Sequence, residues 1–378
     1  MLNHNASGGM VVVTTDGGAG SSGKGALNSF LADKYNFHVA TNNWMSNAGH
    51  FTELDDGTRI LVQHIPSAFV NRDTELYINA GAAVDLGILF EEIIKIEKLG
   101  YPIKSRLTIH PCANVITQAN KDLEKELIKS GSTFKGCGAA IAAKSMRQQK
   151  LAREYEELAP YIRERTFELN EGVTKGMRIL VEGSQGIDLD LNHAEYPYCT
   201  SRQTHPTQLV ADAGFPCQAV TNVIVNIRTN PIRISNESAA TGEHCYTGNY
   251  WDAQEISWQD VAKQAGYEYE EFVIEYGKAM MTSVTKKIRR VFSFPRERMR
   301  FVHAMAGGLL PGSNLLYSLN FVNFVDRNVR GVRTMHEVLT PKINNWLQDN
   351  LYPVIGQDKL KWIRTGPKHS EIVELIGI

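Results

Sequence analysis

Short apolar runs alternate along the chain with longer segments of helical periodicity. Residues 11–13 are three consecutive valines and predict a buried strand, and residues 24–35 predict the helix that follows it. Residues 85–99 place apolar side chains at helical spacing and predict an amphipathic helix. Because strands and helices alternate, we expect an α/β fold in which a mostly parallel central sheet is joined by helical crossovers.

Further strands are expected where β-branched or apolar residues lie between turn signals. They cover residues 38–41, 76–79, 106–109, 177–181, 221–227, 301–303, 315–319 and 360–363, with a hairpin of 51–54 and 58–63 around Asp55-Asp56-Gly57. Helical excursions are expected over residues 120–161 and 335–351 and after the turn at 365–367, and residues 234–258 predict an irregular surface excursion.

Composition narrows the class of protein. The chain has 378 residues, of which 43% are hydrophobic, enough for a large core. Lys and Arg number 40 against 41 Asp and Glu, so the balance indicates neither a nucleic-acid nor a membrane surface. The five cysteines are scattered and lack CxxC spacing, which argues against a disulfide framework and a zinc site. No run of 18 apolar residues occurs, so the sequence predicts no membrane-spanning helix. We expect one soluble, cytoplasmic domain over residues 1–378, with residues 1–10 as a flexible tail.

The glycine-rich segment 17–25 carries the strongest chemical signal. It reads Gly-Gly-Ala-Gly-Ser-Ser-Gly-Lys-Gly between the first strand and the first helix, which makes the expected fold P-loop-like. Backbone N–H groups of the loop, the positive end of the helix and Lys24 together favour a phosphate group. Gly18 and Lys24 have P-loop spacing, but Gly25 stands where that motif has a metal-binding Ser or Thr. A glycine-rich turn without a ligand is the alternative.

A second glycine-rich segment, residues 131–138, interrupts the charged helical region. Its glycines, with Ser, Thr and Lys among them, predict a second anion-binding loop. Most of the charge around it is typical of a solvated helical face.

Four islands of sequence together resemble one known family. They are residues 17–25, residues 47–50 with 64–67, residues 181–186 with 196–201, and residues 364–371. In this order and at these separations they resemble adenylosuccinate synthetase, the family that phosphorylates O6 of a purine nucleotide and joins aspartate to C6. The resemblance implies a homodimeric, C–N bond-forming ligase that uses Mg²⁺.

The resemblance also implies a role for each matched residue. Ser21, Lys24, His50 and Gln185 fall at catalytic positions, where Lys24 and His50 would stabilise charge on the transferred phosphoryl group. The residues implied to contact the triphosphate are Gly20, Ser22, Gly23, Lys24, Gly25, Asn320, Thr365, Gly366 and Pro367. Those implied to contact the purine monophosphate are Ser21, Asn47, Thr133, Arg147, Gln185 and Thr200. The resemblance also implies that Thr285, Lys287 and Arg289 contact aspartate and that Ser21 and Gly49 contact Mg²⁺. Arg147 would act from the neighbouring subunit.

Position 21 departs from the family pattern. The family reads Gly-Asp-Glu-Gly-Lys-Gly, and its Asp binds Mg²⁺ and takes the N1 proton of the purine, whereas residues 20–25 here read Gly-Ser-Ser-Gly-Lys-Gly. A neutral Ser is not a base near neutral pH, so proton removal has to be reassigned or made easier by early phosphorylation of O6. The shorter side chain leaves room at C2, and its hydroxyl can accept from a 2-amino group. This favours a guanylate, dGMP or GMP, over inosinate.

The sequence thus resembles a bacteriophage subset of the family that carries such a Ser and converts dGMP to the 2-amino analogue of adenylosuccinate for diaminopurine DNA, which would place the protein in a host cytoplasm. Asn320 stands where the family reads the guanine of GTP with Asp, and an amide matches adenine, so ATP or dATP is the expected donor. The alternatives are the ordinary reaction of IMP with GTP, a P-loop phosphotransferase, and a non-catalytic nucleotide-binding protein. The choice of dGMP over GMP rests on the resemblance alone.

Overall fold

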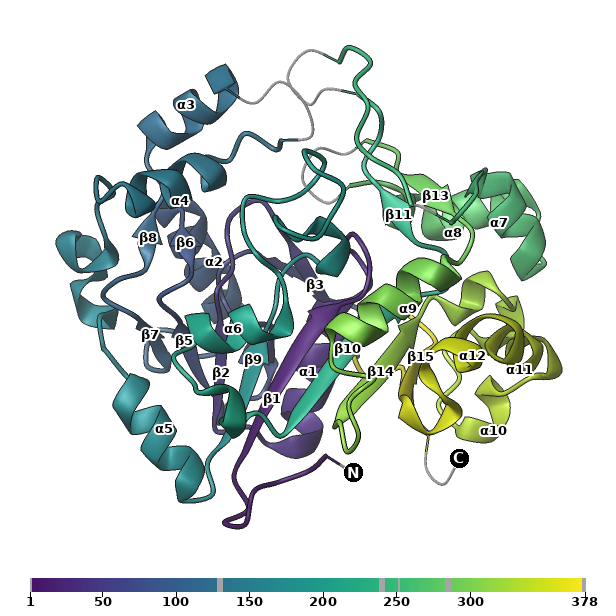
Figure 1. Ribbon diagram of the computed structural model, residues 1–378, viewed down its shortest axis with the longest axis horizontal. Helices are drawn as coiled ribbons and strands as arrows, with labels where there is room; N and C mark the ends of the chain where they lie inside the picture. The colour runs from purple at the N-terminus through teal and green to yellow at the C-terminus, as the bar shows by residue number, and fades with distance from the viewer. Residues whose placement is uncertain (1, 128–131, 238–241, 251, 283–286, 376–378) are drawn as a thin grey trace.

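A nine-stranded sheet forms the centre of the molecule, in the order β16-β15-β14-β10-β1-β9-β2-β5-β7 (Figure 1). This computed structural model describes residues 2–127, 132–237, 242–250, 252–282 and 287–375. The strands are β1 (Met10–Asp16), β2 (Val39–Asn42), β5 (Glu75–Ile78), β7 (Leu107–Ile109), β9 (Arg178–Glu182), β10 (Asn222–Arg228), β14 (Leu315–Asn320), β15 (Leu360–Arg364) and β16 (Ile372–Glu374). All neighbours pair in parallel except β16, which runs antiparallel to β15. The expected α/β fold with a mostly parallel sheet is confirmed.

The central strand β1 is buried on both faces. Val12 belongs to the apolar cluster under α1 (Lys24–Tyr35), whereas Val11 and Val13 pack on the opposite face with α6 (Pro206–Asp212). Figure 1 shows α1 behind the sheet and α6 in front of it. Since consecutive residues of a strand point to opposite faces, a continuous valine run is what a strand covered by helices on both sides requires.

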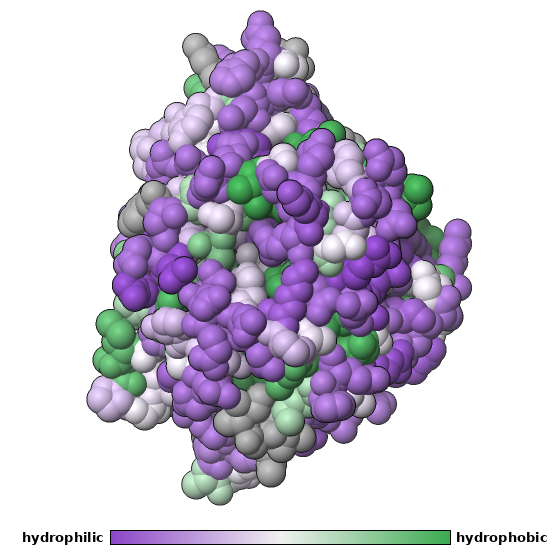
Figure 2. All heavy atoms as spheres, turned by 90° about the vertical axis from the view of Figure 1, so that its right-hand side faces the viewer, coloured by the Kyte–Doolittle hydropathy of each residue, from purple (hydrophilic) through white to green (hydrophobic). Residues whose placement is uncertain are grey.

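The remaining elements surround this sheet. The helices are α2 (Leu86–Lys98), α3 (Gln118–Leu127), α4 (Cys137–Ser145), α5 (Thr166–Thr174), α7 (Trp258–Ala265), α8 (Tyr269–Met280), α9 (Arg296–Met305), α10 (Met335–Val338), α11 (Pro341–Trp346) and α12 (Tyr352–Ile355). Small sheets pair β3 (His50–Glu53) with β4 (Arg59–Val62), β6 (Ala83–Val84) with β8 (Asn114–Val115), and β13 (Arg290–Phe292) with β11 (Ile232–Arg233) and β12 (Glu255–Ile256). The face seen in Figure 2 is mostly hydrophilic with scattered apolar side chains. None of the helices within the described ranges is long and apolar enough to cross a membrane.

Three expected elements differ from the structure. Residues 301–303, expected as a strand, lie in α9, where Met299 and Val302 face the core at helical spacing. The expected closing helix is wrong, because β16 instead adds a strand beside β15. The helical segment expected over 335–351 is divided at Pro341, which lacks an N–H and therefore begins α11.

Residues 2–10, expected as a flexible tail, pack against the sheet. Leu2 is buried in the cluster under α1. The Asn3 N–H donates to Asn222 Oδ1 at 2.9 Å, and Asn222 Nδ2 donates back to Asn3 O at 2.8 Å. These contacts hold the start of the chain beside β10 before it enters β1.

Candidate functional site

The glycine-rich segment, called the phosphate loop below after its predicted ligand, lies where the sequence predicts it, between β1 and α1. β1 ends at Asp16 and α1 begins at Lys24, so the loop comprises residues 17–23. Gly20 and Gly23 have φ values of 84° and 88°, a left-handed conformation that glycine adopts without strain. A Cβ atom at Gly23 would also come within 2.5 Å of Arg364 Nη1. These glycines let the backbone turn into the first turn of α1, where an anion is favoured.

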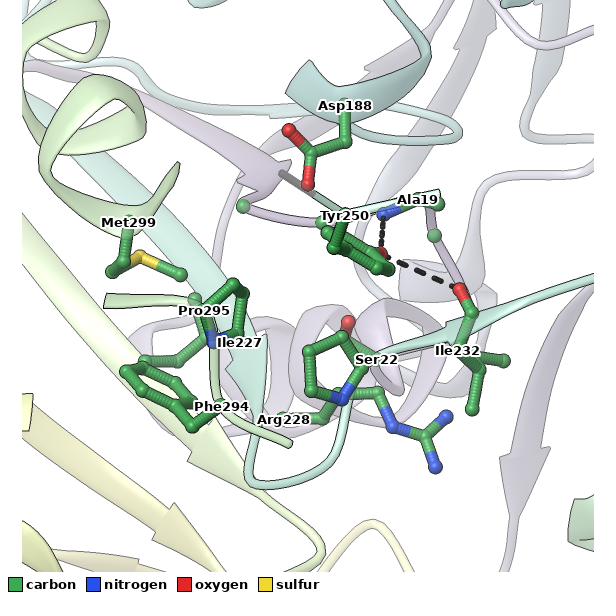
Figure 3. A pocket seen from close by; sticks show the side chains of 14 residues that line it. Ala19, Ser22, Asp188, Ile227, Arg228, Ile232, Tyr250, Phe294, Pro295 and Met299 are labelled. Carbon is green, nitrogen blue, oxygen red and sulfur yellow. Dashed lines mark hydrogen bonds between the residues drawn. The ribbon is translucent and has the colours of Figure 1, made fainter. Parts of the chain in front are cut away.

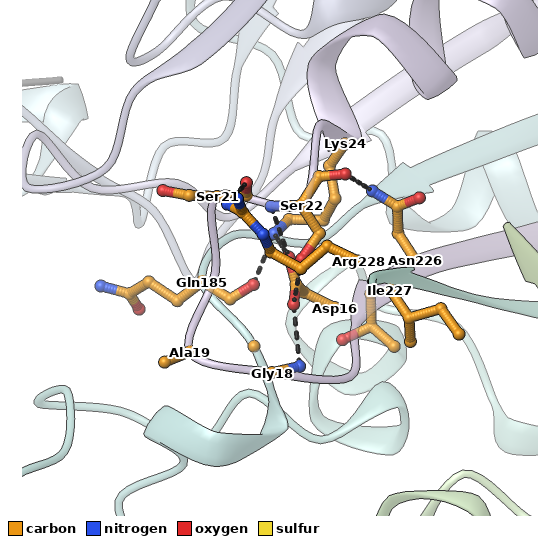
Figure 4. A network of polar contacts seen from close by, with 12 residues as sticks. Asp16, Gly18, Ala19, Ser21, Ser22, Lys24, Gln185, Asn226, Ile227 and Arg228 are labelled. Carbon is orange, nitrogen blue, oxygen red and sulfur yellow. Dashed lines mark hydrogen bonds and ion pairs between the residues drawn. The ribbon is translucent and has the colours of Figure 1, made fainter. Parts of the chain in front are cut away.

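Asp16 holds the loop from inside the fold (Figure 4). Its carboxylate is fully buried and accepts from Gly18 N at 2.8 Å, from Ser22 Oγ and N at 3.0 and 3.3 Å, and from Lys24 Nζ at 2.9 Å. Lys24 Nζ also donates to Gln185 O at 2.5 Å. Lys24 therefore has an acid and a carbonyl as partners before any phosphate binds.

Asp16 was not among the residues predicted for the site. It is the first acidic residue of the chain and comes three positions after the last of the three valines, at the end of β1. Functional side chains gather at the carboxyl ends of parallel strands, and this position was the signal available in the sequence.

The outer side of the loop rests on a small pocket (Figure 3). The Tyr250 hydroxyl accepts from Ala19 N at 3.0 Å and donates to Ile232 O at 3.4 Å. Asp188 lines the same pocket and forms a buried ion pair with Arg298, and burial raises the pKa of Asp188 to about 6 although Arg298 opposes the change. We interpret these contacts as support that fixes the loop against β11 and α9.

Four side chains expected at the purine nucleotide each carry a buried polar atom without a hydrogen-bond partner among the described residues. The atoms are Asn47 Oδ1, His50 Nε2, Gln185 Oε1 and Thr200 Oγ1. Gln185 also has a φ of 55°, which is strained for a residue other than glycine. Because a buried polar atom without a partner is destabilising, these positions indicate a ligand that supplies the partners.

His50 is held rigidly next to the loop. Its ring stacks on Trp44 with 3.7 Å between the ring centroids and 3° between the planes. Burial holds the pKa of His50 well below its usual value, and the nearby charge of Lys24 lowers it further. The imidazole is therefore neutral at physiological pH, and it can donate one hydrogen bond to an oxygen of the substrate.

His64 and Ser67, in the second island of sequence, make contacts within the protein. His64 Nε2 accepts from Asp85 N at 3.1 Å, and burial lowers the pKa of His64 to about 4. Ser67 N donates to Glu182 Oε2 at 2.9 Å, and burial raises the pKa of Glu182 to about 7.

The two segments expected to bind the monophosphate meet in the structure. A Cβ atom at Gly138, in the second glycine-rich segment, would lie 2.9 Å from Ser201 Oγ, so the loop of Thr133 approaches the segment of Thr200. Arg147 follows α4 with a φ of 63°, and its side chain is exposed. The action of Arg147 in a neighbouring subunit stays a prediction.

Asn320 lies under the phosphate loop at the end of β14. A Cβ atom at Gly23 would be 3.3 Å from Asn320 Oδ1. Asn320 Nδ2 donates to Asn226 Oδ1 at 2.5 Å, so the amide donor already has a partner within the protein. Asn320 Oδ1 has no partner in the part of the chain that the structure describes, so only the acceptor is available to a ligand.

The turn after β15 is fixed by its own hydrogen bonds. Thr365 is buried and its hydroxyl donates to Val332 O at 2.8 Å, so this side chain shapes the turn and is not directed at a ligand. A Cβ atom at Gly366 would come within 2.2 Å of Glu371 Oε2, and Arg364 Nη2 donates to Pro367 O at 2.5 Å. The turn approaches the loop through Arg364, whose Nη1 lies next to Gly23.

The predicted aspartate residues lie in the segment before β13. Thr285 is outside the described residues. Lys287 Nζ forms an ion pair with Glu237 at 3.0 Å. Arg289 Nη1 donates to Ala279 O at 3.2 Å, and burial lowers the pKa of Arg289 to about 10. Lys287 thus already has an anionic partner, and Arg289 donates to a backbone carbonyl.

Arg228, at the end of β10, was not predicted. It is 4% exposed, and Nη1 donates to Ser21 O at 3.1 Å. Burial lowers the pKa of Arg228 to about 9, and the charge of Arg289 lowers it further. The two arginines are therefore close enough to interact, and the predicted aspartate segment lies near the phosphate loop.

Comparison with known proteins identifies the family of this site. A family model described as adenylosuccinate synthetase matches residues 13–153 and 148–291, which include the loop, Asn47, His50, Gln185 and Thr200. The chain belongs to the adenylosuccinate synthetase family. Its expected activity as a C–N bond-forming ligase is thereby confirmed, and the alternative of a P-loop phosphotransferase is not supported.

Relatives of two kinds are similar to this adenylosuccinate synthetase homologue. The adenylosuccinate synthetase of Methanococcus aeolicus is 33% identical over 227 residues, 59% of this chain and 67% of that protein. The N6-succino-2-amino-2'-deoxyadenylate synthase of Vibrio phage phiVC8 is 33% identical over 285 residues, 73% of this chain and 76% of that protein. The expected resemblance to the phage subset is confirmed, because this second relative is a phage synthase of that kind.

Solved structures of the family share the fold. The succinoaminodeoxyadenylate synthetase of cyanophage S-2L, bound to dGMP and dATP, aligns with a TM-score of 0.75 at 24% identity, covering 97% of this chain and 95% of that one. The adenylosuccinate synthetase of Plasmodium falciparum aligns with a TM-score of 0.78 at 14% identity, covering 97% and 100%.

The groups at the loop of this adenylosuccinate synthetase homologue fit Mg²⁺ bound mainly by phosphate oxygens. Among the described residues, no three His, Cys, Asp or Glu side chains cluster as a metal site. The Ser21 side chain is exposed and Gly49 is half-buried, whereas the carboxylate of Asp16 is already bound by Lys24 and Ser22. Mg²⁺ in phosphate sites needs few protein ligands, because water and phosphate supply the others.

Proposed function

We propose that this protein joins L-aspartate to C6 of dGMP, with ATP or dATP as phosphoryl donor, and forms 2-amino-2'-deoxy-N6-succinyladenylate for diaminopurine DNA. One observation carries the proposal: an exposed Ser21 occupies the loop position where the family has its catalytic Asp. The loop is next to the purine segment, since a Cβ atom at Gly20 would lie 3.6 Å from Gln185 Cα. The serine removes a carboxylate and leaves room for the 2-amino group of guanine.

The relatives support this substrate. The phiVC8 protein carries the name of the corresponding synthase, and the cyanophage structure holds dGMP and dATP. Adenylosuccinate synthetases of archaea match this chain at similar identity, however, so the choice between guanylate and inosinate rests on the chemistry at position 21.

The residues at the site suit a reaction in two steps. In the first step, O6 of the purine attacks the terminal phosphate of the donor, the nucleoside diphosphate leaves, and the N1 proton of the purine passes to water. Lys24 moves from Asp16 and Gln185 O to bind the phosphoryl oxygens. His50 donates a hydrogen bond from its neutral ring to O6 or to the transferred group. In the second step, the amine of aspartate attacks C6 and phosphate departs. Asn47 and Gln185 orient the purine through their amide oxygens, for which the described part of the chain provides no hydrogen-bond partner.

The adenine of the donor fits the acceptor that Asn320 provides. The 6-amino group of adenine donates hydrogen bonds, and Asn320 Oδ1 accepts them; the 6-oxo group of guanine would face the same oxygen and be repelled. Mg²⁺ would neutralise charge on the phosphates, and the Gly49 carbonyl and Ser21 would hold it. Thr133, Thr200 and, from the second subunit of a homodimer, Arg147 bind the monophosphate. We propose that the enzyme acts in the cytoplasm.

The test is a grid of reactions analysed by mass spectrometry. Purified protein with Mg²⁺ and aspartate is incubated with IMP, GMP or dGMP, each combined with ATP, dATP or GTP. We expect a succino-nucleotide from dGMP with ATP or dATP, and none from the Lys24→Ala variant. A product formed only from IMP with GTP would assign the ordinary adenylosuccinate synthetase reaction, and no product in any mixture would favour a non-catalytic nucleotide-binding protein.

A further inference from the structure

The Arg228 guanidinium is buried with one edge open. Nη1 donates to Ser21 O, and the guanidinium lies 4.0 Å above the centroid of the Phe321 ring, which fixes its plane. Nε and Nη2 have no hydrogen-bond partner among the residues described. We call these two nitrogens the open edge of Arg228. Figure 4 shows Arg228 reaching from β10 toward Ser21.

An open edge on a buried guanidinium indicates an anionic ligand. A buried cation without a counter-charge is strongly destabilising, so proteins pair such groups or use them to bind anions. The negative charge of Asp16 raises the pKa of Arg228, but the Asp16 carboxylate already accepts hydrogen bonds from four other donors. The open edge is also the side of arginine on which two N–H bonds run parallel, which matches the two oxygens of a carboxylate.

We propose that the open edge of Arg228 binds a carboxylate group of the aspartate substrate, with Arg289 as the second cation. The inference rests on the proposed function. Arg289 belongs to the segment predicted to bind aspartate, and its charge acts on Arg228. The triphosphate already has Lys24 and the backbone of the loop, whereas aspartate brings two carboxylates that need cations, and Lys287 is already paired with Glu237.

Steady-state kinetics of Arg228→Lys tests the assignment. Lysine keeps the charge but cannot make two parallel hydrogen bonds, so we expect KM for aspartate to rise about 10- to 100-fold. KM for dGMP and for ATP should stay within about twofold of wild type. Arg300→Lys is the matched control, because Arg300 is exposed and pairs with Glu297, and it should leave all three KM values unchanged. An unchanged KM for aspartate, or an increase confined to ATP, would overturn the proposal.

Thermal unfolding supplies a readout that does not depend on turnover. Without ligands, Arg228→Met should unfold at the same or a higher temperature than wild type, since it removes a buried charge whose Nε and Nη2 have no hydrogen-bond partner among the described residues. Aspartate added with dGMP should raise the Tm of wild type but not that of the variant. If wild type makes no succino-nucleotide, the proposed function fails, yet a Tm shift that needs Arg228 would still support the carboxylate site. Equal shifts in both proteins, or no shift in wild type, would contradict it.

Discussion

The buried ion pair between Asp16 and Lys24 should contribute measurably to folding. The pair has an N–O distance of 2.9 Å, with side-chain exposures of 0% and 4%. Asp16→Asn keeps the oxygen that accepts from Gly18 N and Ser22 Oγ but loses the charge that faces Lys24. Removing one partner of a buried pair costs about 3 to 5 kcal/mol. The two contacts of Oδ1 survive, whereas Oδ2 also loses the weaker hydrogen bond from Ser22 N, so we expect about 3 kcal/mol or slightly more.

Urea unfolding followed by circular dichroism measures this effect. Lys24→Met leaves the carboxylate of Asp16 buried without its cation and should also destabilise the protein. The double variant should be more stable than the sum of the single effects predicts, by about 2 kcal/mol. Glu171→Gln is the control, since its pair with Lys175 is exposed and should change the free energy of unfolding by less than about 0.5 kcal/mol. An Asp16→Asn protein as stable as wild type, or an additive double variant, would refute the reasoning.

Three further predictions follow from the site. Ser21→Asp should reduce kcat/KM for dGMP more than for IMP, because the carboxylate fills the space beside C2; the opposite order in a competition assay would remove the steric argument. Asn320→Asp should lower the ratio of kcat/KM for ATP to that for GTP about tenfold or more, since guanine N–H groups donate to a carboxylate; an unchanged ratio would place donor choice elsewhere. The pKa of His64 is about 4 in the folded protein and 6.5 in the unfolded chain, so the unfolded chain binds a proton first as the pH falls. The contribution of His64 to the free energy of unfolding is therefore complete above pH 6.5 and falls by about 3 kcal/mol toward pH 4. His64→Gln should flatten this part of the pH profile, and an unaltered acid slope would contradict the buried neutral imidazole.

The strands and helices of the central sheet could be predicted because their local signals agree with their final environment. The valine run of β1 is buried on both faces, and α1 begins at Lys24, directly after a glycine that can adopt a left-handed conformation. The prediction of a strand at residues 301–303 was wrong, because the pattern of three residues does not distinguish a strand from one turn of helix. The strand β16 was not predicted, because it forms only by pairing with β15, and its own residues do not indicate that pairing.

The site was predictable only where a residue matched a family motif. Asn47, His50, Gln185 and Thr200 were predicted in that way, and the structure adds that each has a buried polar atom without a hydrogen-bond partner among the described residues. Arg228 could not be found, because its partner Ser21 is 207 positions away. A basic residue at the end of a strand is unremarkable in sequence; its significance comes from burial and from the atoms around it.

Charge connects position 21 with the open edge of Arg228. Arg228 already binds the carbonyl of Ser21, so a carboxylate on residue 21 would give it an internal partner and compete with aspartate. Ser21→Asn and Ser21→Asp add similar volume beside the purine, but only the second adds charge. We therefore expect both variants to use dGMP less well, and only Ser21→Asp to raise KM for aspartate, about tenfold for one charge-assisted contact. The left-handed backbone at residue 21, with a φ of 57°, accommodates Asn and Asp at least as well as Ser, so both variants should fold. Equal KM values for aspartate in the two variants would show that substrate size and substrate charge are not coupled at this position.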